Sequence, residues 1–150
     1  RPATAEGVEP VTLSDLVRTA LRLRPDRLVV GEVRSTECLA LVQAMNTGHD
    51  GSFSTCHANS PLDALLRLES LVLQSAPQWP LDAVRQQLAR SIDVIINVDR
   101  RNGARRIISI DEVAPPPLDG TLTTPATRTI ASLDTTGRLV LRAALRRSRR

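Results

Sequence analysis

The sequence predicts an α/β fold, with a mostly parallel sheet flanked by helices and an antiparallel hairpin at residues 92–113. The first observation is the run Leu28-Val29-Val30-Gly31, whose apolar residues do not alternate with polar ones, as in a strand buried on both faces of a parallel sheet. The second is the alternation of strand-like and helix-like segments as far as residue 98, which favours parallel strands joined by helices. The third is Asn102-Gly103 between two apolar runs, a common hairpin signal.

Four segments are predicted to be helices, because each has a start or stop signal. Thr12 followed by Asp15 is typical of a helix start, and Pro25 ends the apolar periodicity after it. Gly48 ends the second helix, whereas Ser60-Pro61 opens the third with a capping residue and a proline at the first position. The fourth follows Trp79-Pro80. The expected helices are 13–24, 35–47, 61–74 and 81–90.

Further strands are expected at 52–56, 92–98 and 105–113. After three consecutive prolines, residues 118–150 are rich in Thr, Ala and Arg, and they predict only two weak strands around the turn at 134–137. We therefore divide the chain into an α/β part, 1–114, and a weakly structured extension with an arginine-rich end, 115–150. No segment approaches the roughly 20 apolar residues of a membrane-spanning helix, so none is expected.

The charge of the chain is concentrated at one end. All 20 basic residues are arginines. Five of them lie within residues 142–150, and without these five the net charge of +4 falls to −1 for the rest of the chain. Nucleic acid is not an expected partner, because one Trp and one Phe offer little surface for base stacking. The arginine-rich end is either simply solvated or a site for phosphates, acidic lipid headgroups or an acidic partner. Cys38 and Cys56 are not in a C-x-x-C pair and are expected to be free thiols.

Glu32 follows the buried strand directly, at the carboxyl end where open α/β sheets bind ligands. A carboxylate there can hold a magnesium ion through water, or orient an attacking water for phosphoryl transfer. The alternative is a helix-capping or surface carboxylate without a catalytic role. The residues alone leave both interpretations open.

Two histidines flank the strand expected at 52–56. His49 precedes it, and His57 follows it just before the start of the third helix, whose N-terminus attracts anions. An imidazole beside a γ-phosphate can donate a hydrogen bond that differs between a triphosphate and a diphosphate. We predict that both histidines lie at the nucleotide edge of the sheet. Ordinary polar residues near loops are the alternative.

Two stretches of sequence together resemble one known family. They are R-P-D-R-L-V-V-G-E-V-R at 24–34 and A-M-N-T-G-H-D-G-S-F-S-T-C-H-A-N-S-P at 44–61. The chain from Leu16 to about Val113, roughly two-thirds of its length, is similar to bacterial type II and type IV secretion ATPases, particularly the branch that powers tight-adherence (Flp) pili. The match covers that family's Walker B strand, its histidine box, and the helices and hairpin that follow.

The resemblance implies a RecA-like P-loop NTPase fold, of which residues 1–114 are the C-terminal part. It implies ATP and magnesium as cofactors, a ring of six subunits, and work on a secretion or pilus platform protein at the inner membrane, hence a cytoplasmic location at the inner face of that membrane. Glu32 is then the Walker B glutamate, and His49 and His57 belong to the histidine box. Arg18, Arg22 or Arg34 is expected to reach the nucleotide or a neighbouring subunit, although Arg18 and Arg22 equally fit a solvated helix face.

The chain departs from the family in one respect. The phosphate-binding loop G-x-x-x-x-G-K-[ST] requires a lysine, and this sequence has none. We therefore expect a segment of a hexameric secretion ATPase that is inactive alone and whose phosphate-binding loop lies elsewhere. The alternatives are a non-catalytic interaction module and a lysine-free pseudo-ATPase subunit of the same machinery.

Overall fold

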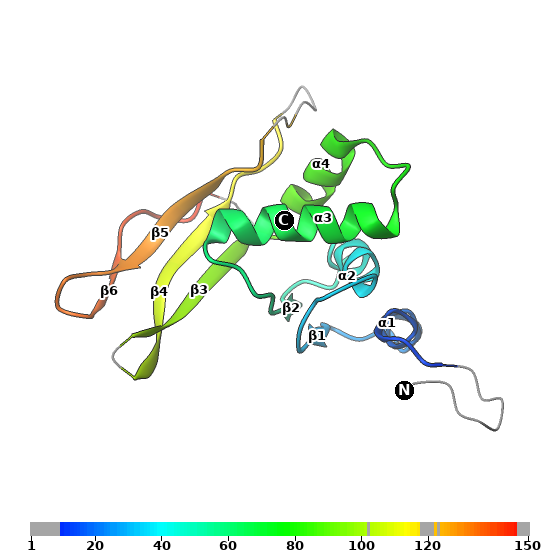
Figure 1. Ribbon diagram of the computed structural model, residues 1–150, viewed down its shortest axis with the longest axis horizontal. Coiled ribbons are helices and arrows are strands. Elements are labelled where there is room, and N and C mark those ends of the chain that lie inside the picture. Colours follow the sequence, from blue (N-terminus) through cyan, green and yellow to red (C-terminus); the bar gives the residue numbers. More distant parts are fainter. Residues whose placement is uncertain (1–9, 102, 118–121, 123, 147–150) are drawn as a thin grey trace.

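The computed structural model describes residues 10–101, 103–117, 122 and 124–146. Figure 1 shows the helices gathered on one side of the molecule, an antiparallel sheet extending from the other side, and a short pair of strands between them. The elements in chain order are α1 (Leu13–Arg22), β1 (Val29–Val30), α2 (Glu37–Met45), β2 (Phe53–Ser54), α3 (Pro61–Ser75), α4 (Leu81–Ser91), β3 (Val94–Arg101), β4 (Ala104–Val113), β5 (Thr127–Leu133) and β6 (Leu139–Leu141).

Local capping signals explain where the helices begin. Thr12 and Asp15 form a reciprocal capping box at the start of α1, with the Asp15 backbone N–H donating to the Thr12 hydroxyl at 3.2 Å and the Thr12 N–H donating to the Asp15 carboxylate at 3.0 Å. The Ser60 hydroxyl accepts from the Asp63 N–H at 3.0 Å, and Pro61 occupies the first turn of α3. All four predicted helices are confirmed within about two residues of their ends.

The larger of two buried apolar clusters lies among the helices. Apolar residues of α1, α2, α3 and α4 pack together with Leu28 and Val30 around β1, and Val72 and Val84 are fully buried where α3 meets α4. The other buried members are Val17, Val33, Cys38, Ala40, Leu41, Val42, Ala44, Leu71 and Leu88. Such burial of aliphatic side chains stabilises a fold by roughly 1.5–3 kcal/mol for each large residue. This core holds β1 and the loop after it in place.

The strands β1 and β2 pair in parallel, with Val29 opposite Phe53 and Val30 opposite Ser54. The α/β prediction is confirmed, but the parallel part of the described chain is this two-stranded pair, and the larger sheet is antiparallel. The prediction that the first strand is buried on both faces is wrong. Leu28 and Val30 lie in the core, whereas Val29 and Phe53 are 60% and 57% exposed, because the helices cover one face of the pair only.

The antiparallel sheet has the strand order β3-β4-β5-β6. The predicted hairpin is confirmed as β3 and β4, joined through Gly103, whose φ of +79° suits glycine. The two strands expected around residues 134–137 are β5 and β6, and they add to this hairpin as part of one sheet rather than forming a weakly structured extension. Whether residue 114 is a domain boundary stays a prediction. The arginines at 147, 149 and 150 lie outside the described residues.

The buried Glu112 side chain holds the C-terminal segment against the sheet through an ion pair and a hydrogen bond. The Glu112 side chain is 3% exposed and pairs with the Arg128 guanidinium on β5. The second oxygen of Glu112 accepts from the Arg146 backbone N–H at 2.8 Å, and Arg128 donates to the Ala144 carbonyl at 2.7 Å. One carboxylate therefore joins β4, β5 and the segment after β6. Within the described ranges, no helix is both long and apolar enough to span a membrane.

Candidate functional site

Glu32 and His57, two of the predicted site residues, follow the carboxyl ends of β1 and β2. Because the two strands are parallel, the loops that leave them emerge at the same edge of the pair. Two hydrogen bonds beyond the strands hold these loops together. The Val33 N–H donates to the Thr55 carbonyl at 2.9 Å, and the Thr55 hydroxyl donates to the Gly31 carbonyl at 2.6 Å. This places Glu32 and His57 side by side.

Glu32 lies between a guanidinium group and an imidazole ring. One carboxylate oxygen accepts a hydrogen bond from the Arg34 guanidinium, and the other lies 3.2 Å from Nε2 of His57. The hydrogen bond from Arg34 lowers the pKa of Glu32, with the nearby charges of His57 and Arg67 acting in the same direction. Glu32 is 22% exposed, whereas the His57 ring is 85% exposed. The cluster is therefore an ionised carboxylate that faces solvent, beside an accessible imidazole.

Arg67 on α3 is a residue of this site that the sequence analysis missed. An open hollow of about 410 Å³ beside the cluster is lined by His57, Ala58, Asn59, Asp63 and Arg67. Arg67 and Asp63 are four residues apart and share one face of α3, directly after the Ser60 cap. The spacing of Asp63 and Arg67 after the Ser60 cap is the sequence signal that could have indicated Arg67. Arg67 adds a second guanidinium group to the surroundings of Glu32, and its charge helps to lower the pKa of Glu32.

Glu37 shapes the loop that carries Glu32 and Arg34. Its carboxylate is buried at the start of α2 and accepts from the backbone N–H groups of Arg34 at 2.5 Å and Ser35 at 2.9 Å. Burial opposes the ionisation of Glu37, but these hydrogen bonds and its own N–H together lower its pKa. Glu37 thus stays charged at the helix N-terminus, where a carboxylate is favoured, and it holds the loop in one conformation.

His49 does not join the cluster, so the prediction that both histidines lie at one edge is wrong. It precedes β2 and therefore lies at the opposite end of that strand from His57. Its Nδ1 lies 3.1 Å from the Ala44 carbonyl at the end of α2, and its own carbonyl accepts from the Ser52 hydroxyl. The reason is that one strand delivers its two ends to opposite edges of a sheet. In this structure, His49 closes the turn between α2 and β2.

Of the three arginines considered as contacts to the nucleotide or to a neighbouring subunit, Arg34 lies in the cluster. Arg18 and Arg22 are exposed on α1. The beginning of that helix lies near the beginning of α2, where the Ser14 hydroxyl is 3.4 Å from that of Thr36. This placement fits a solvated face or a contact with another subunit rather than the cluster around Glu32.

Both cysteines are free, as predicted. Burial, with the nearby Glu37 charge, raises the pKa of Cys38 to about 12, and burial also raises the pKa of Cys56. Neither thiol is therefore activated as a nucleophile. In the part of the chain that the structure describes, no three His, Cys, Asp or Glu residues group in a way that could hold a metal ion.

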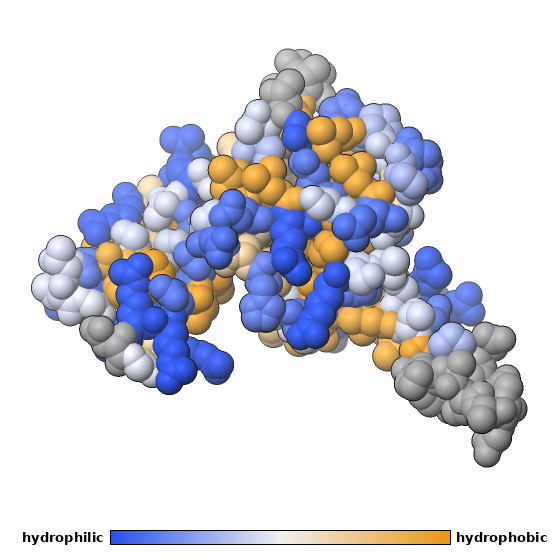
Figure 2. Space-filling model, viewed as in Figure 1, coloured by the Kyte–Doolittle hydropathy of each residue, from blue (hydrophilic) through white to orange (hydrophobic). Residues whose placement is uncertain are grey.

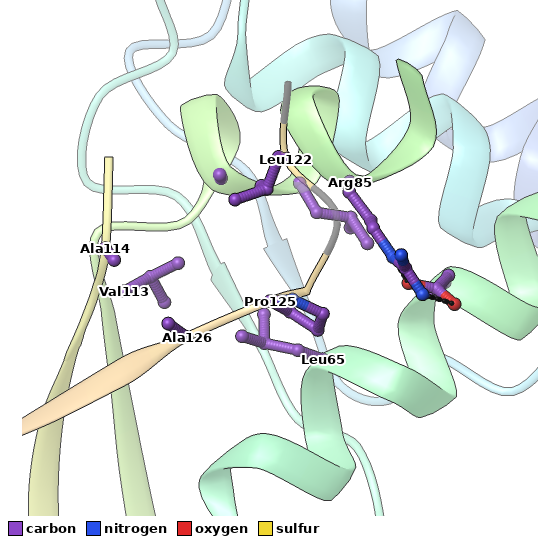
Figure 3. Close-up of a pocket in the computed structure, with 10 residues that line it drawn as sticks. Leu65, Arg85, Val113, Ala114, Leu122, Pro125 and Ala126 are labelled. Carbon is purple, nitrogen blue, oxygen red and sulfur yellow. Dashed lines mark hydrogen bonds and ion pairs between the residues drawn. The ribbon is translucent and has the colours of Figure 1, made fainter. Parts of the chain in front are cut away.

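A second pocket lies where α3 and α4 meet the antiparallel sheet. Figure 3 shows Leu65, Val113 and Leu122 pointing into it, with Arg85 at its side. Arg85 pairs with Glu69 across α3 and α4 at 2.7 Å. The space measures about 10 Å³, roughly the volume that one water needs. It is a packing gap between the helices and the sheet, not a ligand site.

Comparison with known proteins places this geometry in a family. Residues 4–146 match the family model described as type II/IV secretion system protein. A Mycobacterium tuberculosis (strain H37Rv) protein named for conjugal transfer is 46% identical over 113 residues, which are 73% of this chain and 31% of that relative. The type IV secretion system protein VirB11 of Brucella suis is 34% identical over 111 residues, 71% of this chain and 31% of the relative.

A solved structure agrees with these sequences. The crystal structure of the VirB11 ATPase from the Brucella suis type IV secretion system, in complex with sulphate, is similar with a TM-score of 0.64 and 32% identity over 67% of this chain and 32% of that one. This chain thus spans about a third of the length of the relatives that it matches. Since the family model covers nearly every residue and the fold matches a secretion ATPase, the chain belongs to the type II/IV secretion system protein family.

Proposed function

We propose that this chain is the part of a hexameric secretion ATPase that acts on the γ-phosphate of ATP, while the loop that cradles the phosphates lies in another part of the protein. The observation that carries the proposal is the meeting of Glu32, Arg34 and His57 at the carboxyl edge of a parallel strand pair. In open α/β sheets this edge is where ligands bind. The likeness to a solved secretion ATPase supports the same reaction.

The side chains of the cluster suit a magnesium-bound phosphate group. Magnesium is commonly held by one or two carboxylates together with phosphate oxygens and waters, so Glu32 alone is a sufficient protein ligand, through water. When bound, the ion neutralises charge on the phosphate oxygens. Arg34, His57 and Arg67 surround Glu32 with donors that fit anionic oxygens. Because the hydrogen bond from Arg34 lowers the pKa of Glu32, the carboxylate is ionised and can orient the attacking water.

An exposed apolar pair lies next to this cluster. Val29 and Phe53 are cross-strand partners three and four residues before Glu32 and His57, and both are more than half exposed. Exposed apolar side chains on a strand pair of this length call for a covering element. We infer that the segment with the phosphate-binding loop packs there, which would bring the phosphates to Glu32. Its source is a longer chain of the same family or a separate one.

The remaining proposals follow from the family resemblance. The working assembly is a homo-hexamer at the inner face of the cytoplasmic membrane, where it acts on a secretion or pilus platform protein. The tight-adherence branch is the proposed system. The alternative is a non-catalytic interaction module or a lysine-free pseudo-ATPase subunit of the same machinery, which would occupy the ring without turnover.

ATP hydrolysis tests the proposal. The purified chain alone is expected to show no magnesium-dependent hydrolysis, because the missing loop supplies most phosphate contacts. Fusing the lysine-bearing loop segment of a related secretion ATPase in front of residue 1 is expected to produce turnover, measured as phosphate release. Turnover by the unfused chain that Glu32→Gln abolishes would contradict the division of roles. A folded fusion that binds ATP without hydrolysing it would favour the pseudo-ATPase.

The two histidines provide a matched test within such a fusion. If His57 reads the γ-phosphate and signals its loss to a neighbouring subunit, His57→Ala keeps ATP affinity within roughly 1 kcal/mol but loses secretion or pilus output. His49→Ala, at the opposite end of β2, is expected to lower the melting temperature slightly and leave output per folded molecule unchanged. Equal losses of output in both variants, in proportion to soluble protein, would reduce His57 to a structural role.

A further inference from the structure

Arg67 is the arginine of the candidate site whose guanidinium group is not engaged. It is exposed on α3, and within the described residues it forms no ion pair and no hydrogen bond. Asp63 lies four residues earlier on the same helix face, at a spacing that allows pairing, but the described chain contains no such pair. Arg34, by contrast, is bonded to the Glu32 carboxylate. Arg67 can therefore bind an incoming group without first breaking a contact.

The direction of side chains on α3 brings Arg67 towards the cluster. A long side chain on a helix points back to the helix N-terminus, so the Arg67 guanidinium is directed to the loop between β2 and α3. It lines the hollow beside His57. The hydrogen bond from Arg34 has the largest effect in lowering the pKa of Glu32, and the charge of Arg67 also contributes. Figure 2 shows strongly hydrophilic side chains below α3, near the short strand pair.

The hollow is polar and open, which suits a small hydrated anion better than an apolar ligand. Its donors are the Arg67 guanidinium, the Asn59 amide and the His57 imidazole, and its one carboxylate is Asp63. A guanidinium presents its N–H groups in a fork that matches two oxygens of one phosphate group. The volume of about 410 Å³ leaves room for that group and several waters of about 30 Å³ each. Because Asp63 repels an anion, binding is expected to be weak and reversible, as the release of a product requires.

We propose that Arg67, rather than Arg34, binds the terminal phosphate of ATP and then the inorganic phosphate that hydrolysis releases. The proposal rests on the ATPase function proposed above. In that reaction the oxygen of a water bonds to the γ-phosphorus, and the bond from that phosphorus to the bridging oxygen breaks. ADP keeps the bridging oxygen, and a proton of the water passes to another oxygen of the released phosphate. Glu32 orients the water, while Arg67 holds the group that is transferred.

The contacts of the two arginines explain this division of roles. For Arg34 to reach a phosphate, its guanidinium has to leave Glu32, and an unpaired carboxylate would then face an anionic group. Arg67 has no such contact to give up. Arg34 therefore keeps Glu32 in position, and Arg67 contacts the phosphate. Because ADP lacks the terminal phosphate, the contact with Arg67 also distinguishes ATP from ADP.

Titration of the purified chain with inorganic phosphate tests this assignment without any turnover. Nitrogen-15 spectra of the arginine Nε–Hε groups, at an ionic strength held constant with potassium chloride, follow each guanidinium separately. We expect a saturable shift of the Arg67 signal, identified by its loss in Arg67→Gln, and no shift of the Arg34 signal, identified in the same way.

The backbone amide signal of Asn59, which also lines the hollow, measures phosphate affinity in every variant. Arg67→Gln should weaken phosphate binding about tenfold, the loss expected when one charged donor is removed. Arg67→Lys should weaken it only about threefold, because lysine keeps the charge but lacks the fork of N–H groups.

Arg90→Gln is the matched control. Arg90 is exposed in the last turn of α4, outside the lining of the hollow, so the variant removes the same charge from a different place. It should change phosphate affinity by no more than about twofold. Circular dichroism confirms that each variant is folded. In carbon-13 titrations of the carboxyl groups, Arg67→Gln should raise the pKa of Glu32, which Arg34, His57 and Arg67 surround, and Arg90→Gln should leave it unchanged.

Three results would overturn the assignment. If Arg67→Gln and Arg90→Gln weaken binding equally, phosphate binding follows net charge. If the Arg34 signal shifts while the Arg67 signal stays, Arg34 is the phosphate ligand. If no signal shifts saturably, the hollow binds no phosphate. Each of these results leaves the proposed ATPase function standing, because phosphate release by the fusion decides that function separately.

Discussion

Glu32→Gln is expected to cut the turnover of a fusion that carries a phosphate-binding loop by on the order of 10²-fold or more, while ATP affinity stays nearly unchanged. The physical reason lies in the cluster. Glutamine keeps the shape of Glu32 but removes the negative charge that Arg34 and His57 face. Orientation of the attacking water and stabilisation of charge act mainly in the transition state, so their loss appears in the rate rather than in binding.

Steady-state phosphate release and a fluorescent-nucleotide titration on the same preparation separate the two quantities. Asp50→Asn is the matched control, because Asp50 is an exposed carboxylate at the other end of β2, beside His49. Its turnover should equal that of the unmodified fusion. If Glu32→Gln and Asp50→Asn have the same turnover, Glu32 has no part in the reaction. A parallel loss of ATP affinity in Glu32→Gln would instead indicate a role in binding.

Glu112→Gln is expected to lower the free energy of unfolding by about 3 kcal/mol or more. The Glu112 carboxylate is buried and bonds both the Arg128 guanidinium and the Arg146 backbone. Removing its charge leaves the Arg128 guanidinium, itself only 28% exposed, without its carboxylate partner, and breaking a buried pair in this way typically costs about 3–5 kcal/mol. Urea unfolding followed by circular dichroism measures the change as a shift in midpoint.

The exposed pair Asp99 and Arg101 provides the comparison for that measurement. Both side chains are more than half exposed, so Asp99→Asn should cost no more than about 1 kcal/mol. If the two variants unfold at the same urea concentration, the Glu112 pair contributes no more than a surface contact. Trypsin should also cut near Arg142 sooner in Glu112→Gln than in Asp99→Asn, because the segment after β6 loses its anchor on β4.

The local elements of this protein could be predicted from sequence because their signals lie within a few residues. Thr12 with Asp15 and Ser60 with Pro61 set the starts of α1 and α3, and the Asn102-Gly103 signal predicted the hairpin turn in which Gly103 lies. The meeting of Glu32 and His57 also followed from sequence. Glu32 follows β1 by two residues and His57 follows β2 by three, and parallel strands deliver their carboxyl ends to one edge of a sheet.

The positions of Arg67, His49 and Val29 depend on packing between distant segments, so only the tertiary structure decided them. Arg67 was not predicted, because it approaches Glu32 from a helix 35 residues later in the chain. His49 fell outside the site because the strand direction separates it from His57, although both flank the same strand. The apolar run at Leu28 predicted burial on both faces, but hydrophobicity does not say which faces find a partner, and Val29 is exposed.

For the antiparallel sheet too, the sequence predicted the strands but not which side chains would be buried. The apolar run at 92–98 predicted a strand, but not that Ile96 and Val98 would lie opposite the helices and on the same face as Arg100. The sequence of this protein by itself determined its helices, its turns and the Glu32 motif, since these depend on neighbouring residues. Only the folded chain decides which segments pack together. That packing sets the register between strands, the burial of Glu112 and the exposure of apolar side chains on the sheet.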